Sequence, residues 1–284
     1  MSFENLCYDQ LAFKASHNSY ERDEDLLEQL QWNDGQRWDG GCRGLELDIN
    51  RHSDSTNGTS ESYFQVSHDQ GGEGPTLASY LRDLATFHTN DTAHDPVLVC
   101  LDIKSKEGSK TAFPDEIDNY LRSWFDASLI CTPGQCMVDP NLDLAPNLKA
   151  HGWPLLSALN GRFFFCLSGN NDWKSNYSKT SPRDRLCFAD FDVEDTTPPN
   201  TTTSQYRAVA NVHLYSDNYG NWKDLIPGLR ARRLLVRGYI LNSSSIWSKA
   251  QSAGVNVLAT DKVSNNEWAQ VGNAPMVPSA PQMS

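Results

Sequence analysis

The sequence predicts an α/β fold and, within that class, a distorted (β/α)8 barrel. Three observations lead to this prediction. Short apolar runs typical of β-strands recur along the 284 residues, and helical patterns lie between several of them. The length also suits a barrel of about 250 residues in one domain. Strands that alternate with helices indicate a parallel sheet.

Eight apolar or alternating runs are bounded by Gly, Pro, Asn or Asp, as strands commonly are. We expect them to form the barrel at residues 11–16, 44–49, 64–67, 96–103, 163–167, 208–214, 234–240 and 255–260. A ninth run at 186–191 is interpreted as an excursion between the fifth and sixth strands. The second and third runs leave little room for a helix between them, so the barrel is expected to be irregular.

Helical periodicity is clearest where Leu77, Tyr80, Leu81, Leu84 and Phe87 form one apolar face. Residues 116–130 show a similar pattern, and 245–253 is a short helical candidate before the last strand. We expect residues 1–270 to form a single barrel with a polar insertion near 169–207. Residues 271–284, which contain Pro and Ser, are expected to form a C-terminal tail.

The charge balance is acidic, with 36 Asp and Glu against 24 Lys and Arg and a net charge of −12. Nucleic acid is therefore not an expected partner, because binding a polyanion requires basic surface. The same balance argues against constitutive docking on strongly anionic membranes. It fits an acidic site that holds a divalent cation, although excess acid is also common on solvated surfaces. We expect a monomer.

The sequence contains no run of 18 or more apolar residues, so no transmembrane helix is expected. Of the seven cysteines, Cys131 and Cys136 flank a turn-forming stretch, and Cys7 and Cys42 precede neighbouring predicted strands. Two disulfides are therefore expected, and Asn-x-Ser/Thr sequons start at residues 57, 90, 176, 200 and 242. These features predict an extracellular protein whose signal peptide is absent from this chain.

Pairs of charged residues end two of the predicted strands. Glu46 and Asp48 are two positions apart and so point to the same face, and Asp102 and Lys104 repeat this spacing. Carboxylates on an inward face are poorly solvated unless a cation or a set of salt bridges compensates them. In a parallel barrel, both pairs would lie at the open mouth formed by the C-terminal ends of the strands.

Two histidines stand beside these acids at matching positions. His17 and His68 each follow a predicted strand by one residue, and His213 ends the sixth strand. Hard divalent cations prefer oxygen ligands, so Ca²⁺, or alternatively Mg²⁺, fits Glu46, Asp48, Asp102 and the amide oxygen of Asn18. Zn²⁺ fits less well, because the histidines are needed for acid/base chemistry.

The order of these motifs resembles a known family. His17-Asn18-Ser-Tyr, Leu-Glu46-Leu-Asp48, a strand ending in His68, and Leu-Asp102 are similar to the catalytic barrel of phosphatidylinositol-specific phospholipase C. The small Ca²⁺-dependent microbial enzymes are the most similar. Two later stretches, Leu-Val-Arg237-Gly-Tyr239-Ile and 254–261, resemble the last two strands of that family. The resemblance implies a PLC-like phosphodiesterase type of TIM barrel.

The resemblance also implies roles for individual residues. His17 and His68 would be the catalytic pair at the phosphate, and Asn18, Glu46, Asp48 and Asp102 would bind the metal. Arg237 would contact the phosphate. Where the family commonly has a second arginine this chain has Tyr239, so the reaction is better predicted than the alcohol of the substrate. Tyr239, His213 and Trp222 are candidate substrate contacts.

The predicted reaction is general acid/base cleavage of a phosphodiester, and the expected substrate is a phosphatidylinositol-type phospholipid. His68 would protonate the leaving alcohol, while His17, Lys104 and Arg237 would stabilise the charged phosphate. The expected substrate is a small molecule or phospholipid, with transient contact to a membrane surface. Sphingomyelinase D-like or glycerophosphodiester phosphodiesterase activity is one alternative. A non-catalytic barrel that binds glycans or lipids through aromatic side chains is another.

Overall fold

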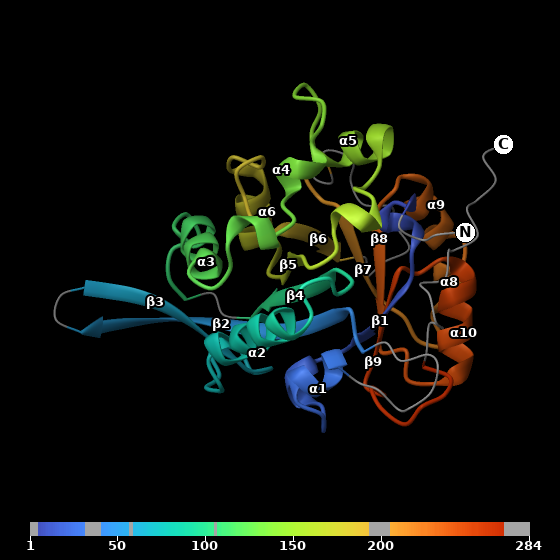
Figure 1. Cartoon of the computed structure of the whole chain (residues 1–284), viewed down its shortest axis with the longest axis horizontal. Coiled ribbons are helices and arrows are strands. Elements are labelled where there is room, and N and C mark those ends of the chain that lie inside the picture. The colour runs from blue at the N-terminus through green and yellow to red at the C-terminus, as the bar shows by residue number, and fades with distance from the viewer. Residues whose placement is uncertain (1–4, 32–40, 57–58, 105–106, 193–204, 270–284) are drawn as a thin grey trace.

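The computed structural model describes residues 5–31, 41–56, 59–104, 107–192 and 205–269. Its centre is a closed barrel of eight parallel strands (Figure 1). They are β1 (Phe13–Ser16), β2 (Gly44–Thr56), β4 (Val97–Ile103), β5 (Phe163–Gly169), β6 (Phe188–Asp192), β7 (Val209–His213), β8 (Leu235–Tyr239) and β9 (Val257–Thr260). β1 pairs with β9 and also with β2, where Ala15 is the partner of Gly44, and this pairing closes the ring. The predicted fold class is confirmed.

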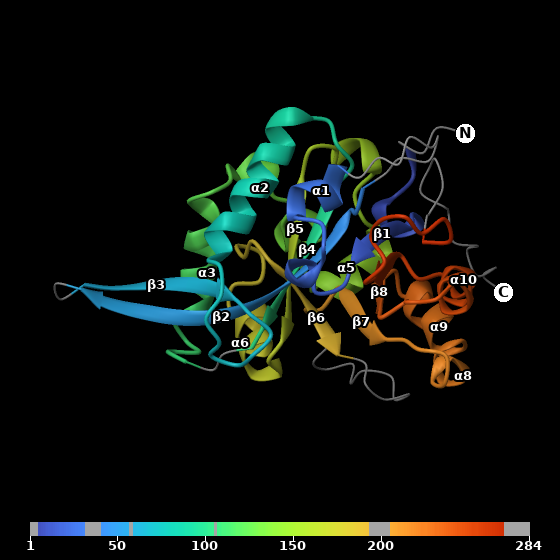
Figure 2. The ribbon, with the colours of Figure 1, turned by 90° about the horizontal axis from the view of Figure 1, so that it is seen from below.

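Two strands have a different role from the one predicted. β3 (Thr59–Val66) is not a barrel strand, because β2 runs past the barrel wall and β3 pairs back onto it antiparallel from Thr59 to Val66. This hairpin projects from the side of the barrel (Figure 2). β6, predicted as an excursion at 186–191, is instead a barrel strand between β5 and β7.

Helices surround the barrel, with α2 and α3 on the side that carries the hairpin (Figure 1). They are α1 (Leu26–Gln31), α2 (Leu77–Asn90), α3 (Phe113–Arg122), α4 (Pro133–Cys136), α5 (Leu144–His151), α6 (Asn171–Lys179), α8 (Tyr219–Trp222), α9 (Leu225–Ala231) and α10 (Ser244–Ala253). The helices predicted at 77–87 and 245–253 are confirmed. The one predicted at 116–130 ends at Arg122, and a short 3-10 turn capped by Asp126 follows.

Alternation along β2 determines which residues line the mouth. Leu45, Leu47 and Ile49 are buried in a cluster with the apolar face of α2, so they face the helix layer. Glu46 and Asp48 therefore point into the barrel. Below them the interior is filled by apolar side chains, among them Tyr8, whose ring stacks on Phe164 with centroids 4.7 Å apart. The polar residues thus lie above an apolar floor.

The predicted disulfides are wrong: all seven cysteines are free thiols. The Cys7 thiol contacts Arg233 and that of Cys42 contacts Ser16, so these two have different neighbours. The thiols of Cys131 and Cys136 contact each other without a bond.

Within 169–207, the described part contains α6 and β6, and the predicted tail at 271–284 lies outside the described residues. Among the helices that the structure describes, none is long and apolar enough to cross a bilayer.

Candidate active site

Three carboxylates form the centre of the site. Glu46 and Asp48 from β2 and Asp102 from β4 each place an oxygen within 4.8 Å of the others. Asp48 and Asp102 are register partners on adjacent strands, which is why their side chains meet. We call these three residues the carboxylate cage. Within the part of the chain that the structure describes, no other group of three potential metal ligands comes together.

Glu46 is the most strongly compensated member of the cage. One oxygen, Oε2, accepts from Arg237 Nη2 at 2.7 Å and from the backbone N–H of Asn18 at 3.1 Å. Burial alone would raise its pKa, but Arg237, His17 and the Asn18 N–H outweigh burial, and the pKa of Glu46 is lowered. Glu46 is therefore ionised at neutral pH.

Asp48 and Asp102 each use one oxygen for hydrogen bonds. Asp48 Oδ2 accepts from Tyr20 at 2.8 Å and lies 3.0 Å from His68 Nδ1 and 3.1 Å from Lys104 Nζ. Lys104 also donates to Asp102 Oδ2 at 3.1 Å. The second oxygen of each carboxylate, Oδ1, is buried without a hydrogen-bond partner. Unpaired buried oxygens of this kind are costly unless a cation binds them.

Burial also changes how these two acids titrate. It raises the pKa of Asp102 to about 6, with Lys104 opposing the rise and Asp48 and Glu46 adding to it. The pKa of Asp48 rises for the same leading reason, again opposed by Lys104. Each carboxylate is thus held in a place where its charge is poorly stabilised. A divalent cation would remove that cost.

The cage fits a hard cation such as Ca²⁺. It offers only oxygen atoms, and two of them are unpaired. Asn18, the fourth predicted ligand, lies against the cage through its backbone, while its side-chain nitrogen donates to Glu21 Oε2 at 2.9 Å. Asn18 has a left-handed backbone with φ of 43°, and this turn brings its N–H to Glu46.

His17 is oriented by Asp261, a residue with no predicted role. Its Nδ1 lies 2.9 Å from Asp261 Oδ1, just past the end of β9. Burial would raise the pKa of Asp261, but the contacts with His17, Arg22 and Asn242 lower it. An ionised carboxylate can only accept, so Nδ1 of His17 is the donor. The lone pair of a neutral His17 is then on Nε2, 3.9 Å from Glu46 Oε2.

Arg237 lies inside the barrel and is almost fully buried. Besides Glu46, it donates through Nη1 to Asn211 Oδ1 at 2.7 Å, and Asn211 in turn donates to Ser168 at 3.2 Å. Burial would lower the pKa of Arg237, yet Glu46 raises it, so the guanidinium remains charged. The predicted residues His17, His68, Lys104, Arg237 and the cage are thus brought together at one mouth.

The three candidate substrate contacts have different surroundings. The Tyr239 ring lies between His17 and His213, with centroids 5.7 and 5.0 Å away and rings nearly parallel. Trp222 is not at the mouth. It is 2% exposed and belongs to an apolar cluster with Val212 and Ile226. Trp222 is therefore a core residue, and its prediction as a substrate contact is wrong.

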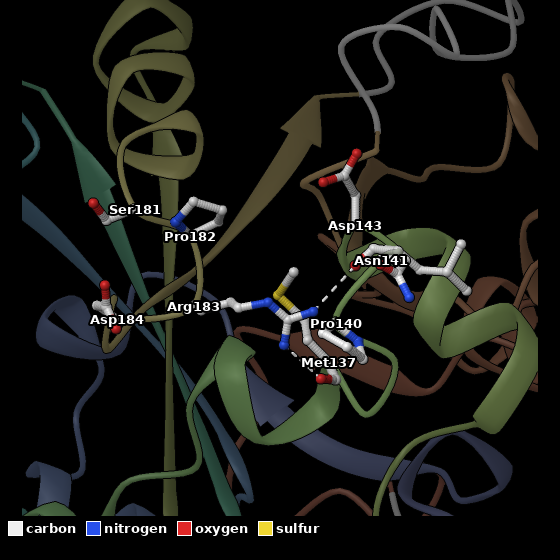
Figure 3. A pocket seen from close by; sticks show the side chains of 9 residues that line it. Met137, Pro140, Asn141, Asp143, Ser181, Pro182, Arg183 and Asp184 are labelled. Carbon is white, nitrogen blue, oxygen red and sulfur yellow. Dashed lines mark hydrogen bonds between the residues drawn. The ribbon is translucent and has the colours of Figure 1, made fainter.

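Four further residues of the site were missed: Arg22, Tyr20, Asn211 and Asp261. Asp261 follows β9 by one position, as His17 follows β1, and that parallel was the available signal. Tyr20 is placed by the short 3-10 turn Ser19–Glu21, for which the sequence has no clear pattern. A separate pocket of about 280 Å³, between the loop after α4 and the loop before β6, contains none of these residues (Figure 3).

An eight-stranded parallel barrel with carboxylates, histidines and cations at its mouth defines a PLC-like phosphodiesterase barrel, and solved structures share this fold. A Ca²⁺-dependent phosphoinositol-specific phospholipase C from a Pseudomonas species is 19% identical, with 94% of this chain and 95% of that chain covered and a TM-score of 0.75. A Ca²⁺-dependent phosphatidylinositol-specific phospholipase C from Streptomyces antibioticus is 16% identical, with 90% of this chain and 95% of that chain covered and a TM-score of 0.66. An Oleispira antarctica phosphodiesterase in complex with the product sn-glycerol-3-phosphate is 14% identical, with 89% of this chain and 94% of that chain covered and a TM-score of 0.52.

A comparison of the sequence with models of protein families identifies the family. The chain belongs to the Ca²⁺-dependent phosphoinositide phospholipase C family, whose model matches residues 64–208. It is therefore a phosphodiesterase, and the alternative of a non-catalytic binding barrel is set aside. No curated protein sequence matches the chain significantly.

Proposed function

We propose that this protein cleaves the phosphodiester of a phosphatidylinositol-type phospholipid by Ca²⁺-assisted general acid/base catalysis. One observation carries the proposal: His17 and His68 flank the carboxylate cage, and each has its Nδ1 bonded to a carboxylate, Asp261 and Asp48 respectively. Because Nδ1 is occupied in both imidazoles, Nε2 is the nitrogen left for proton transfer. A pair of oriented histidines beside a cation site suits attack and departure at one phosphorus.

Ca²⁺ would be held by Glu46, Asp48, Asp102 and the amide oxygen of Asn18. When bound, it supplies positive charge that neutralises phosphoryl oxygens and favours deprotonation of a hydroxyl. Mg²⁺ is the alternative ion. It requires near-ideal octahedral geometry at short distances, whereas Ca²⁺ accepts a more flexible set of oxygen ligands. The family is Ca²⁺-dependent, so we propose Ca²⁺.

His17 is proposed as the general base. Its Nε2 carries the lone pair because Nδ1 donates to Asp261, so it accepts the proton of the attacking hydroxyl. Asp261 fixes the tautomer and stabilises the imidazolium that forms. The sequence alone predicts a charge-stabilising role for His17, and the contact with Asp261 is the reason to propose a base instead.

His68 is proposed as the general acid that protonates the leaving alcohol. Its side chain is 63% exposed, which suits a residue that faces the departing half of a lipid substrate. Lys104 and Arg237 contribute positive charge beside the phosphate, and electrostatic contacts of this kind are often worth about 3 kcal/mol each in the transition state.

The substrate alcohol is the least constrained part. Tyr239 stands where the resemblance leads one to expect a second arginine, so this position supplies no positive charge to bind an inositol. This observation favours a second candidate substrate, a glycerophosphodiester. We also propose transient membrane contact at the mouth, where Tyr215 is 43% exposed beside His213. Secretion remains a prediction from the sequence.

Phosphorus NMR of the reaction with phosphatidylinositol, and separately with a glycerophosphodiester, tests the proposal. We expect a cyclic phosphate from phosphatidylinositol if a substrate hydroxyl attacks, and loss of turnover after chelation by EDTA. Activity that persists in EDTA would contradict the metal assignment. Turnover of the glycerophosphodiester alone would replace the first substrate by the second.

A further inference from the structure

The ammonium of Lys104 lies inside the carboxylate cage. Lys104 Nζ is 3.1 Å from Asp48 Oδ2 and 3.1 Å from Asp102 Oδ2, so it bridges the two acids whose other oxygens are unpaired. These two carboxylates are its ion-pair partners, so the ammonium is the positive charge between them. A cation that enters the cage meets a positive charge already in place.

Only the side chain of Lys104 needs to move to relieve this repulsion. Its backbone N–H donates to the carbonyl of Ile49 at 3.0 Å, which ties the residue to β2. Its side chain remains 24% exposed, whereas that of Asp48 is 1% exposed. The long, flexible stem of lysine allows the ammonium to turn away from the acids toward the open mouth.

We propose that Ca²⁺ displaces the Lys104 ammonium from between Asp48 and Asp102, and that the displaced ammonium then binds the phosphate of the substrate. This inference rests on the proposed function of the same site. It makes Lys104 a residue that weakens Ca²⁺ binding in the absence of a phosphate and couples the two ligands when both are present. By linkage, the phosphate strengthens Ca²⁺ binding by the same factor as Ca²⁺ strengthens phosphate binding.

Glu46 is paired with Arg237 and not with Lys104, so the two positively charged residues of the site have different roles. Arg237 pairs with Glu46 from within the barrel, where it is 1% exposed and also held by Asn211. Its guanidinium is held in place by these bonds and is almost fully buried. Lys104 is thus the exchangeable counter-charge and Arg237 the permanent one.

Calorimetric titration with Ca²⁺ tests the proposal in wild type, Lys104→Met and Lys104→Arg. Met is close in length to Lys and uncharged, so we expect Ca²⁺ to bind Lys104→Met at least about tenfold more tightly than wild type. Lys104→Arg keeps the charge and should stay near wild type. Lys262→Met is the matched control, because Lys262 is an exposed lysine that follows β9 at the same end of the barrel.

The second measurement repeats each titration with saturating sn-glycerol 3-phosphate as a phosphate monoester. We expect the ester to tighten Ca²⁺ binding several-fold in wild type and in Lys262→Met, and to tighten it clearly less in Lys104→Met, where only the direct attraction between Ca²⁺ and the ester remains. Thermal unfolding with and without Ca²⁺ checks that Lys104→Met is folded and shows the larger Ca²⁺ shift by a separate readout.

The outcomes separate this inference from the proposed function. If wild type binds Ca²⁺ but Lys104→Met binds it equally or more weakly, the displacement of Lys104 is wrong and the metal site stands. If neither protein binds Ca²⁺ at millimolar concentration, the metal site is wrong and the inference fails with it. Equal coupling to the phosphate ester in both proteins would overturn the second half of the proposal.

Discussion

Asp261 accepts the Nδ1 hydrogen of His17 across 2.9 Å, although the two residues are 244 positions apart in the chain. They meet because β1 and β9 are neighbours in the closed barrel, with Ser16 paired to Thr260. The first and last strands thus assemble the proposed base. Closure of the barrel is a requirement of the chemistry as well as of the fold.

Asp261→Asn should lower kcat by at least about a hundredfold with little change in KM. An amide can donate as well as accept, so the His17 tautomer with its lone pair on Nε2 is no longer enforced. Steady-state kinetics on phosphatidylinositol would show the effect. Asp217→Asn, an exposed aspartate in the loop after β7, is the control and should be near wild type. Equal rates in the two variants would refute the role of Asp261.

His68→Ala should reduce turnover of the phospholipid by at least roughly a hundredfold. A nitrophenyl phosphodiester has a leaving group that needs no protonation, so the same variant should lose far less activity on it. Comparison of the two substrates isolates the acid role. His151→Ala, at the exposed end of α5, should leave both rates unchanged. A loss of equal size on both substrates would show that His68 has another role.

Ca²⁺ affinity should fall as the pH decreases through about 6. Burial raises the pKa of Asp102 to about 6, so below that pH a proton competes with the cation for this carboxylate. Titrations in buffers of different ionisation enthalpy should reveal proton release on binding near pH 6 and little release at pH 8. An affinity that is constant from pH 5 to 8 would contradict the placement of Asp102 in the cage.

Asp102→Asn should stabilise the metal-free protein at pH 7.5. The folded pKa of about 6 lies above the unfolded value near 3.9, so the folded state binds more protons and loses stability as the pH rises between these values. Removal of the charge should recover up to about 3 kcal/mol of unfolding free energy. Urea denaturation in EDTA at pH 7.5 measures this gain, which should shrink toward pH 4. If the variant is less stable than wild type at pH 7.5, the Asp102 charge does not destabilise the metal-free protein.

Trp222→Ala should reduce the free energy of unfolding by about 3–5 kcal/mol, because it removes a large buried side chain from the cluster around Val212 and Ile226. The folded fraction should retain its KM. Tyr219→Ala, in the same short helix but only half-buried, should cost less. A raised KM at unchanged stability would restore Trp222 to the substrate site.

Local spacing was sufficient to predict much of the site. The two-residue spacings of Glu46 with Asp48 and of Asp102 with Lys104 specify the face of a strand, and the structure places all four side chains at one mouth. The barrel was likewise predictable, because its strands are short apolar runs with turn residues between them. These features depend only on neighbouring residues in the chain.

The misassigned elements depend on contacts that a local pattern does not show. β3 carries apolar Phe64 and Val66, as a barrel strand would, but it faces back along β2 instead of crossing to a new position. The Asn57-Gly58 pair between the two strands was the sequence signal for a hairpin. Trp222 was misassigned because an aromatic residue in a loop or short helix has no periodicity that reports its burial.

The base of the β2–β3 hairpin positions His68, and the length of its outer part does not affect this position. His68 is fixed at its base, where Ile49 pairs with Val66 and the Ser67 N–H donates to the carbonyl of Asp48 at 3.0 Å. The outer pairs, such as Ser55 with Ser60, continue the same ladder away from this base. Matched removal or addition of residues in both strands would leave His68 in place, whereas an unmatched change near the base would turn it to the opposite face. The outer hairpin is therefore a graft point, at which a foreign segment can be added without moving His68.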